Sequence, residues 1–212
     1  MISDSIEQYL ESLRNNREGL VKEMEEYANI HHVPIMEQTS LDVMLQILSF
    51  KQPKKILEIG TAIGYSALRM AKTVPDVHIV TVEKDEARYK KAVDFLEHAE
   101  ERNRIEVLFG DALELAEDIK AKAPYQAVFI DAAKGQYQKF FDEYAPLVEK
   151  DGIVISDNIL FRGMVAEEGV TEKRFKTMVK KLRSYNQYLM EHPDFQSTVY
   201  PIGDGVIISE KQ

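Results

Sequence analysis

The stretch Lys54–Gly64 constrains the fold of this chain more than any other part of the sequence. It reads K-K-I-L-E-I-G-T-A-I-G, a short apolar run that ends in an acidic residue and then turns through two glycines. A helix-like segment follows, beginning near Tyr65. A strand, a tight loop and a helix start in this order are typical of the cofactor site of an open α/β sheet.

The spacing of the glycines indicates which kind of cofactor this loop suits. A dinucleotide-binding loop needs three glycines to close on a pyrophosphate, and here the second and third would fall on Ala62 and Tyr65. The pattern is instead Glu58-x-Gly60-x-x-x-Gly64. This pattern disfavours a nicotinamide dehydrogenase and suits a cofactor without phosphates. The alternative is a glycine-rich turn that binds nothing, since such loops are common in α/β folds.

Composition restricts the class of protein. The 212 residues suit one domain with a full core, and the hydrophobic content of 44% is ordinary for a globular protein. No apolar run approaches the ~20 residues of a membrane span, and the N-terminus lacks a signal-peptide layout, so we expect a cytoplasmic protein without membrane contact. The absence of cysteine excludes disulfides and thiolate metal sites. The net charge of −9 argues against broad nucleic-acid binding but permits a local basic patch.

Apolar runs of strand length alternate with helix-like segments from Lys54 onward. The predicted strands are 54–59, 77–82, 104–109, 125–130 and 152–156, followed by a hairpin of 198–202 and 206–209. Two helices are predicted within 3–29, and a third begins at Thr39 or Ser40 and runs through Phe50. The sequence therefore predicts an α/β fold, with a mostly parallel seven-stranded sheet, a C-terminal antiparallel hairpin and helices on both faces. We expect one domain, 1–212, with a helical cap over 1–50 and the core over 51–212.

Acidic residues fall repeatedly at the ends of the predicted strands, where ligands bind in such sheets. They are Glu58, Glu83, Asp111, Asp131 and Asp157. Carboxylates at buried strand ends are costly unless they have partners. Glu83 lies 23 residues beyond Gly60, near the offset of an acid that accepts from ribose hydroxyls, or else it is a solvated strand end. Asp111 either accepts from an adenine amino group or caps a helix.

A second group of polar residues follows the last two predicted parallel strands. Asp131, Asp157 and Asn158 supply two carboxylates and an amide oxygen, the hard ligands that Mg²⁺ prefers. Taken alone, Asp157-Asn158 is also compatible with a simple turn. Lys134 comes three residues after Asp131. An ammonium beside a dication loses its proton more easily, so Lys134 could serve as a general base; the alternative is a solvated lysine.

Together these motifs resemble the metal-dependent, catechol-type O-methyltransferases that use S-adenosyl-L-methionine. The similarity implies a Rossmann-like methyltransferase fold, with Lys134 as the catalytic residue and Mg²⁺ or a similar divalent cation as cofactor. It implies metal ligands at Asp131, Asp157 and Asn158. Residues implied to bind S-adenosyl-L-methionine are Met36, Glu58, Gly60, Gly64, Ser66, Glu83, Asp111, Ala112 and Asp131. Within this set, Ser66 would contact the methionyl carboxylate and Met36 would cover the cofactor through its backbone. Intact metal and lysine positions disfavour a non-catalytic binding protein.

The stretches His31–Glu37, Ile130–Tyr137 and Asp157–Val165 resemble one bacterial branch of this family, the tRNA 5-hydroxyuridine methyltransferases. Animal catechol enzymes have larger side chains between the metal aspartate and the lysine, whereas this chain has Ala132 and Ala133. The similarity implies conversion of 5-hydroxyuridine to 5-methoxyuridine at the wobble position of the tRNA anticodon. The 5-hydroxyl and 4-carbonyl oxygens of that base are vicinal, like the two oxygens of a catechol. The alternative acceptor is a small catechol-like compound, such as a caffeoyl derivative.

A basic stretch offers a surface for the anticodon loop of tRNA as a partner. Segment 171–184 contains six lysines and arginines against one glutamate, and Lys173, Lys176 and Lys180 share a helical face. Arg162 follows the predicted metal residues and could reach a phosphate or the base. A solvated helix face is the alternative interpretation of the basic stretch. The resemblance and the N-terminal helices also lead us to expect a homodimer.

Overall fold

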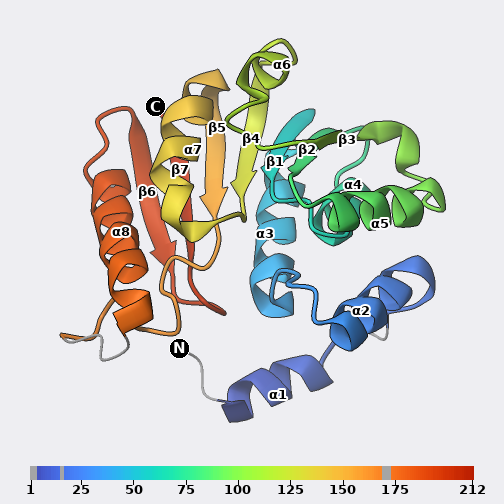
Figure 1. The fold of residues 1–212 in the computed structure, drawn as a ribbon, viewed down its shortest axis with the longest axis horizontal. Coiled ribbons are helices and arrows are strands. Elements are labelled where there is room, and N and C mark those ends of the chain that lie inside the picture. Colours follow the sequence, from blue (N-terminus) through green and yellow to red (C-terminus); the bar gives the residue numbers. More distant parts are fainter. Residues whose placement is uncertain (1–3, 15–16, 169–172) are drawn as a thin grey trace.

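The computed structural model describes residues 4–14, 17–168 and 173–212, and its centre is one seven-stranded sheet (Figure 1). The strand order is β3-β2-β1-β4-β5-β7-β6, with parallel pairing from β3 through β5 and antiparallel pairing of β7 with both neighbours. The strands are β1 Lys55–Ile59, β2 His78–Glu83, β3 Ile105–Phe109, β4 Tyr125–Ile130, β5 Val148–Ser156, β6 Phe195–Tyr200 and β7 Val206–Lys211. This arrangement confirms the predicted Rossmann-like fold with its C-terminal hairpin.

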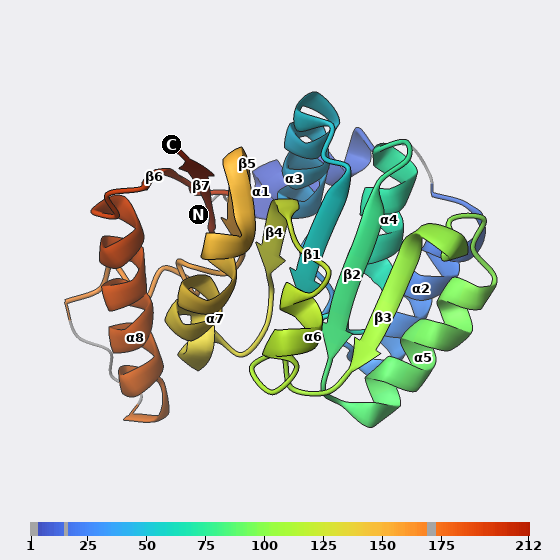
Figure 2. The same cartoon turned by 90° about the horizontal axis from the view of Figure 1, so that it is seen from above.

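Helices cover both faces of the sheet, which gives three layers (Figure 2). One face packs against α2, α3, α4 and α5, and the other against α6, α7 and α8. The helices are α1 Asp4–Ser12, α2 Gly19–His31, α3 Gln38–Lys51, α4 Tyr65–Thr73, α5 Glu86–Glu97, α6 Ala116–Lys120, α7 Tyr137–Tyr144 and α8 Lys173–Met190. Short 3₁₀ turns lie at Arg102–Arg104, Lys134–Gln136 and Ala145–Leu147.

The central strands are buried on both faces because each is rich in β-branched and other apolar residues. In β1, Ile56 packs into the cluster under α3 and α4, whereas Leu57 packs into the cluster under α7 and α8. Both side chains are fully buried. Burial on both faces is characteristic of parallel strands between two helical layers. Polar groups that contact a ligand must therefore lie at the strand ends.

Several element boundaries differ from the sequence predictions. Helix α3 was predicted to be capped by Thr39 or Ser40, but the cap is Glu37, whose carboxylate accepts from the backbone N–H groups of both residues. Helix α5 begins after Asp85, whose carboxylate accepts from Arg88 N–H at 2.9 Å, and it ends at Glu97, before a 3₁₀ turn. Between β3 and β4 the chain forms α6, which is five residues long. A short helix before a cis Ala123-Pro124 bond was not evident from the apolar pattern.

The N-terminal segment is attached to the core through Asp42 on α3. The Arg14 guanidinium lies 3.0 Å from the Asp42 carboxylate, and that of Arg69 on α4 lies 3.2 Å from the same group. Ile6 and Tyr9 of helix α1 and Leu13 directly after it are exposed, and Figure 1 shows α1 set apart from the sheet. Covering this apolar stripe by a second copy would fit the expected homodimer, which stays a prediction. Among the described residues, none of the helices has the length and apolar character needed to span a membrane.

We predict that Glu37→Ala lowers the free energy of unfolding by about 1 kcal/mol, the usual effect of removing an N-cap. Partial burial alone would raise the pKa of Glu37, but hydrogen bonds from Thr39 and Ser40 outweigh it and lower the pKa. A lowered carboxyl pKa stabilises the fold above the unfolded-state pKa and loses this effect as the pH falls. Urea denaturation should therefore show that the difference in free energy of unfolding between the wild-type and Glu37→Ala proteins narrows below about pH 4. Glu37→Gln, which keeps an acceptor, is the control, and an equal loss in both variants would contradict the capping role.

Candidate active site

Backbone hydrogen bonds bring the carboxyl ends of β2, β1, β4 and β5 together. The N–H of Gly60 donates to Val82 O at 3.0 Å, that of Asp131 to Ile59 O at 3.0 Å, and that of Asp157 to Ile130 O at 3.2 Å. Gly60 has a φ of +107°, and a Cβ at this position would lie 2.0 Å from the Asp131 carbonyl oxygen. Only glycine therefore permits the first loop to pass so close to the end of β4.

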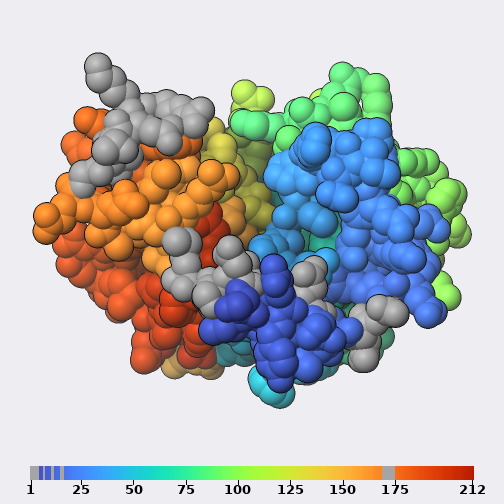
Figure 3. Space-filling view, turned by 90° about the horizontal axis from the view of Figure 1, so that it is seen from below, coloured from blue at the N-terminus to red at the C-terminus, as the bar shows by residue number. Residues whose placement is uncertain are grey.

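A cavity of about 350 Å³ opens at these strand ends. Figure 3 shows this face of the molecule, with the α8 half on one side and the α2 half on the other. The residues that line the cavity are Pro34, Ile35, Met36, Ile59, Gly60, Ala62, Val82, Glu83, Lys84, Arg88, Gly110, Asp111, Ala112, Asp131, Ala132, Ala133, Lys134, Phe140, Asp157 and Asn158. The structure thus gathers most of the predicted cofactor residues and all predicted metal ligands around one space.

Glu83 is fixed by the backbone on both sides of its carboxylate. One oxygen accepts from Ala62 N–H and the other from Asp85 N–H, each at 2.8 Å. The side chain is buried at the cavity wall, and each oxygen retains a second lone pair. This geometry suits an acceptor for vicinal hydroxyl groups. Asp111, by contrast, accepts from Leu113 N–H at 3.0 Å, so it organises the turn after β3 as well as lining the cavity.

Glu58, Gly64 and Ser66 lie behind the cavity wall. The Ser66 hydroxyl donates to one Glu58 oxygen, and the Thr81 hydroxyl donates to the other at 2.5 Å. Burial raises the pKa of Glu58 to about 7 despite these two donors. Because its hydroxyl proton is engaged, Ser66 would meet a methionyl carboxylate through its backbone N–H, which lies in the first turn of α4. The cofactor contacts of these three residues stay predictions.

The second group contains Asp131, Lys134, Asp157 and Asn158. The Lys134 ammonium donates to Asn158 Oδ1 at 2.6 Å, and Asn158 Nδ2 donates to Asp157 Oδ2 at 3.0 Å. The Tyr137 hydroxyl donates to the Asp157 carbonyl oxygen at 3.0 Å, which fixes the end of β5. Asp157 is 1% exposed, and its Oδ1 has no hydrogen-bond partner among the described residues. A buried carboxylate oxygen without a partner is costly, so this cluster is suited to an added cation.

The surroundings of Asp131 and Asp157 disfavour the ionised forms of both side chains. Burial raises the pKa of Asp131 to about 6, although Lys134 opposes the shift. Burial, and secondly the Asp131 charge, raise the pKa of Asp157 to about 8. A dication between them would favour the ionised forms.

Protein side chains supply only part of the ligand set that a hard divalent cation needs. Within the described part of the chain, no three His, Cys, Asp or Glu side chains form a metal-binding group. Two carboxylates and one amide oxygen are nevertheless hard ligands, and Mg²⁺ usually keeps several waters or substrate oxygens. The unpartnered Asp157 oxygen marks the position where such an ion would bind.

Comparisons with known proteins identify the family. The O-methyltransferase family model matches residues 3–212. The chain belongs to the O-methyltransferase family. A Staphylococcus aureus structure, provisionally named a caffeoyl-CoA O-methyltransferase, is 36% identical with a TM-score of 0.92, covering 99% of this chain and 100% of that one. The flavonoid 3',5'-methyltransferase of Vitis vinifera is 29% identical, covering 95% of this chain and 87% of that protein. The caffeoyl-CoA O-methyltransferase of Populus kitakamiensis is 25% identical, covering 99% and 94%.

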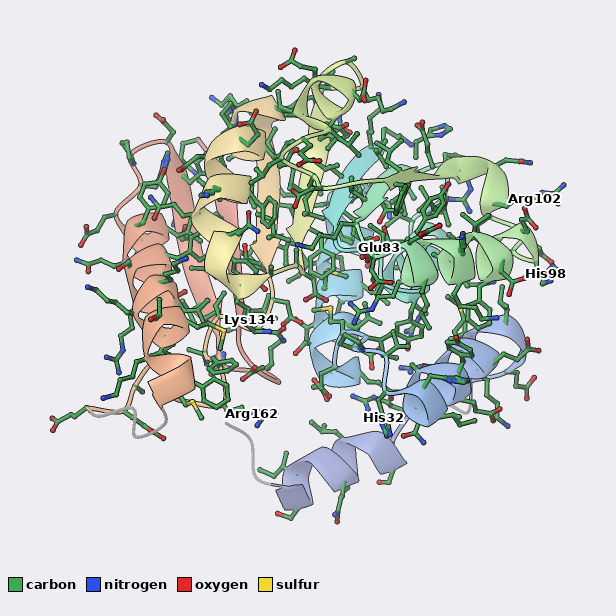
Figure 4. All side chains as sticks on the ribbon, viewed as in Figure 1. His32, Glu83, His98, Arg102, Lys134 and Arg162 are labelled. Carbon is green, nitrogen blue, oxygen red and sulfur yellow. The ribbon has the colours of Figure 1, made fainter. Side chains whose placement is uncertain are left out.

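In this O-methyltransferase, several cavity residues were not among the predicted site residues. Lys84 directly follows Glu83, so the rule that ligands lie beyond strand ends could have identified it. Arg88 and Phe140 come from the first turns of α5 and α7 and have no signal in the sequence. Arg162 is exposed beside the site. Figure 4 places Lys134 and Arg162 on the α8 side and Glu83 on the α5 side.

The basic stretch of this O-methyltransferase is partly engaged by the protein itself. Part of it, 171–172, lies outside the described residues, as do the side chains of Lys173 and Arg174. Lys181 donates to Gly135 O at 3.1 Å, and Arg183 donates to Val165 O at 2.8 Å. Lys176 and Lys180 are exposed. The stretch therefore positions active-site loops as well as presenting charge.

We predict that metal-free wild-type protein loses stability as the pH rises from about 5 to 8, because the folded state binds protons at Asp157 that the unfolded chain has released. Asp157→Asn should flatten this profile and raise the free energy of unfolding near pH 8 by a few kcal/mol, on the order expected for a buried carboxyl with a strongly raised pKa. Urea denaturation in EDTA measures the profile. Asp118→Asn, at an exposed aspartate, is the control and should follow wild type. Parallel profiles for all three proteins would contradict the raised pKa.

Proposed function

We propose that this O-methyltransferase transfers the methyl group of S-adenosyl-L-methionine to one oxygen of an acceptor with two vicinal oxygens, of the catechol or caffeoyl class. The observation that carries the proposal is the contact of Lys134 with Asn158, directly beside the unpartnered Asp157 oxygen at the cavity wall. The names of the Vitis and Populus relatives support this acceptor class.

The β1–α4 side of the cavity is the proposed place of the cofactor. Gly60 gives close backbone approach, Glu83 offers its free lone pairs to ribose hydroxyls, and Asp111 lies toward the adenine. The loop lacks the glycines needed for a pyrophosphate, which agrees with a cofactor that carries a sulfonium and no phosphates. Met36 is 4% exposed and closes the cavity from the α3 side.

Asp131, Asp157 and Asn158 would hold a divalent cation, with Mg²⁺ as the proposed ion. When bound, it would supply a Lewis acid that orients two acceptor oxygens and lowers the pKa of the hydroxyl. The protein residues contribute the rest. Lys134, once neutral, takes the hydroxyl proton at Nζ, and its 2.6 Å contact with Asn158 Oδ1 places this atom beside the proposed cation ligands.

Methyl transfer itself is a displacement at carbon. The acceptor oxygen forms the new bond to the methyl carbon while the bond from that carbon to sulfur breaks, which leaves neutral S-adenosylhomocysteine. The proton ends on Lys134. The cavity holds donor and acceptor in line, an effect worth several kcal/mol, on the order of 7 to 11 in favourable cases. Phe140 and the Pro34–Met36 segment line this space with apolar side chains.

A 5-hydroxyuridine in the tRNA anticodon loop is the second candidate acceptor. The Phe161 and Phe175 rings lie 5.3 Å apart, which brings the basic beginning of α8 beside the site. The Lys134 ammonium lies 5.9 Å from the Phe161 ring, so Phe161 borders the reacting groups and could stack on a base. Arg162, Lys176 and Lys180 are exposed near this edge and offer phosphate contacts.

We predict that the enzyme methylates caffeoyl-CoA but not the monohydroxy analogue p-coumaroyl-CoA, because only the former presents vicinal oxygens. Transfer of a labelled methyl group from S-adenosyl-L-methionine, with and without EDTA, measures this. The same assay with tRNA from cells that lack this gene tests the second candidate. Methyl transfer to that tRNA but not to caffeoyl-CoA would make 5-hydroxyuridine the proposed acceptor in place of the small compound. Transfer to neither acceptor, or full activity in EDTA, would contradict the proposed function.

We predict that Lys134→Ala and Lys134→Arg both lower kcat by about 10²- to 10⁴-fold, the usual contribution of a general base. Arginine keeps the positive charge and the donor to Asn158 but cannot become neutral. Cofactor affinity, measured by calorimetry, should not change in either variant. Lys150→Ala is the control, at an exposed lysine near the amino end of β5, away from the cavity. Wild-type kcat in Lys134→Arg would show that charge alone is needed and would contradict the base assignment.

A further inference from the structure

The segment that follows Asp157 has an unusual backbone. Asn158, Phe161 and Arg162 have φ values of +56°, +45° and +55°. Residues other than glycine rarely adopt positive φ, and each such residue costs of order 1 kcal/mol unless the surroundings fix it. Three such residues lie within five positions, in the segment that contacts Lys134. Contacts from outside the segment must therefore hold this conformation.

The turn between β6 and β7 supplies this restraint. Ile159 N–H donates to Gly205 O at 3.0 Å, and Leu160 N–H donates to Asp204 O at 2.9 Å. The carboxylate of Asp204 accepts from Arg162 N–H. A Cβ at position 205 would lie 2.3 Å from Leu160 Cγ, so the turn packs directly on the segment. Of these contacts, the one to Arg162 is made by a side chain and can be removed without altering the backbone.

The same turn also contacts the cofactor side of the cavity. The Ser40 hydroxyl donates to Ile202 O at 3.3 Å, and a Cβ at Gly203 would lie 2.2 Å from Ser40 Oγ. Ser40 lies in the first turn of α3, after Met36 of the cavity wall and the cap residue Glu37. The turn therefore joins the wall of the cofactor space to the segment that carries Asn158 and Phe161.

We propose that Asp204 is a positioning residue for methyl transfer: it holds the strained segment in the conformation that presents the Asn158 amide oxygen to Lys134 and the cation, and the Phe161 ring to the acceptor. This inference rests on the proposed function, because it assigns Asn158 a ligand role. Asp204 does not line the cavity and acts through the backbone N–H of Arg162.

Loss of the Asp204 contact should release the positive φ angles at Phe161 and Arg162. Asn158 lies at the start of the same segment, and α8 holds its neighbour, because Asn186 Nδ2 donates to Ile159 O at 3.0 Å. Relaxation would displace both the amide oxygen and the Phe161 ring from the site. Residues that orient metal ligands in this way typically change metal affinity or activity by about 10- to 100-fold when removed.

The test compares Asp204→Ala with Asp204→Asn. The alanine variant should weaken Mn²⁺ binding, measured by electron paramagnetic resonance, and raise the acceptor KM by about 10- to 100-fold. The asparagine variant keeps an oxygen that accepts from Arg162 N–H and should stay close to wild type in both. Cofactor affinity should be unchanged in both variants, and this also reports correct folding. If the alanine variant fails to bind cofactor, Asp204→Ser replaces it, because a serine hydroxyl is too short to reach the amide.

The outcomes separate this inference from the proposed function. If Asp204→Ala binds Mn²⁺ as tightly as the wild-type protein does, the positioning role of Asp204 is overturned and the proposed function is not. Equal losses in Asp204→Ala and Asp204→Asn would also overturn it, because they would assign the effect to charge rather than to the hydrogen bond. Absence of Mn²⁺ binding by the wild-type protein would overturn the proposed function and the role of Asp204 with it.

Discussion

Negative charge at the ends of buried strands is the constraint around which this structure is organised. The carboxylates of Glu58, Glu83 and Asp157 are each less than a tenth exposed, so each needs a partner. Glu58 has two hydroxyl donors, and Glu83 has two backbone N–H donors. Asp157 retains an oxygen without a partner among the described residues. In the proposed function, the two satisfied acids shape the cofactor side and the unsatisfied one marks the reactive side.

The arrangement of the elements makes this division possible. The strands β2 and β3 lie on one side of β1, whereas β4 and β5 lie on the other, and the neighbouring carboxyl ends of the parallel strands β1 and β4 leave space for a ligand where the strand order changes. Gly60 lets the first loop pass against Asp131, so this loop and the Asp131 carboxylate share one wall of the cavity. On the far side, the β6–β7 turn and α8 hold the segment after Asp157 from two directions. The site thus depends on parts of the chain that are distant in sequence.

The sequence predicted local features well and tertiary features poorly. The β1–loop–α4 unit, the acids at the strand ends and the terminal hairpin all follow from short patterns of apolar residues and glycines. Arg88 and Phe140 could not be predicted, because their places in the cavity depend on how α5 and α7 pack. Asp204 lies in a turn, and its link to Arg162, 42 positions earlier, arises only when β7 pairs beside β5. Likewise, the basic stretch predicted a charged surface, but Arg183 instead binds a loop carbonyl.

The central claim is that Asp131, Asp157 and Asn158 form a cation site beside Lys134 within the O-methyltransferase cavity. A crystal structure with S-adenosylhomocysteine and Mn²⁺, phased with anomalous data at the manganese edge, tests it most directly. The account predicts one anomalous peak about 2 Å from oxygens of all three side chains, with the Lys134 ammonium moved away from Asn158 Oδ1. A map with bound S-adenosylhomocysteine but no peak at Asp157, and with Lys134 still bonded to Asn158, would contradict it.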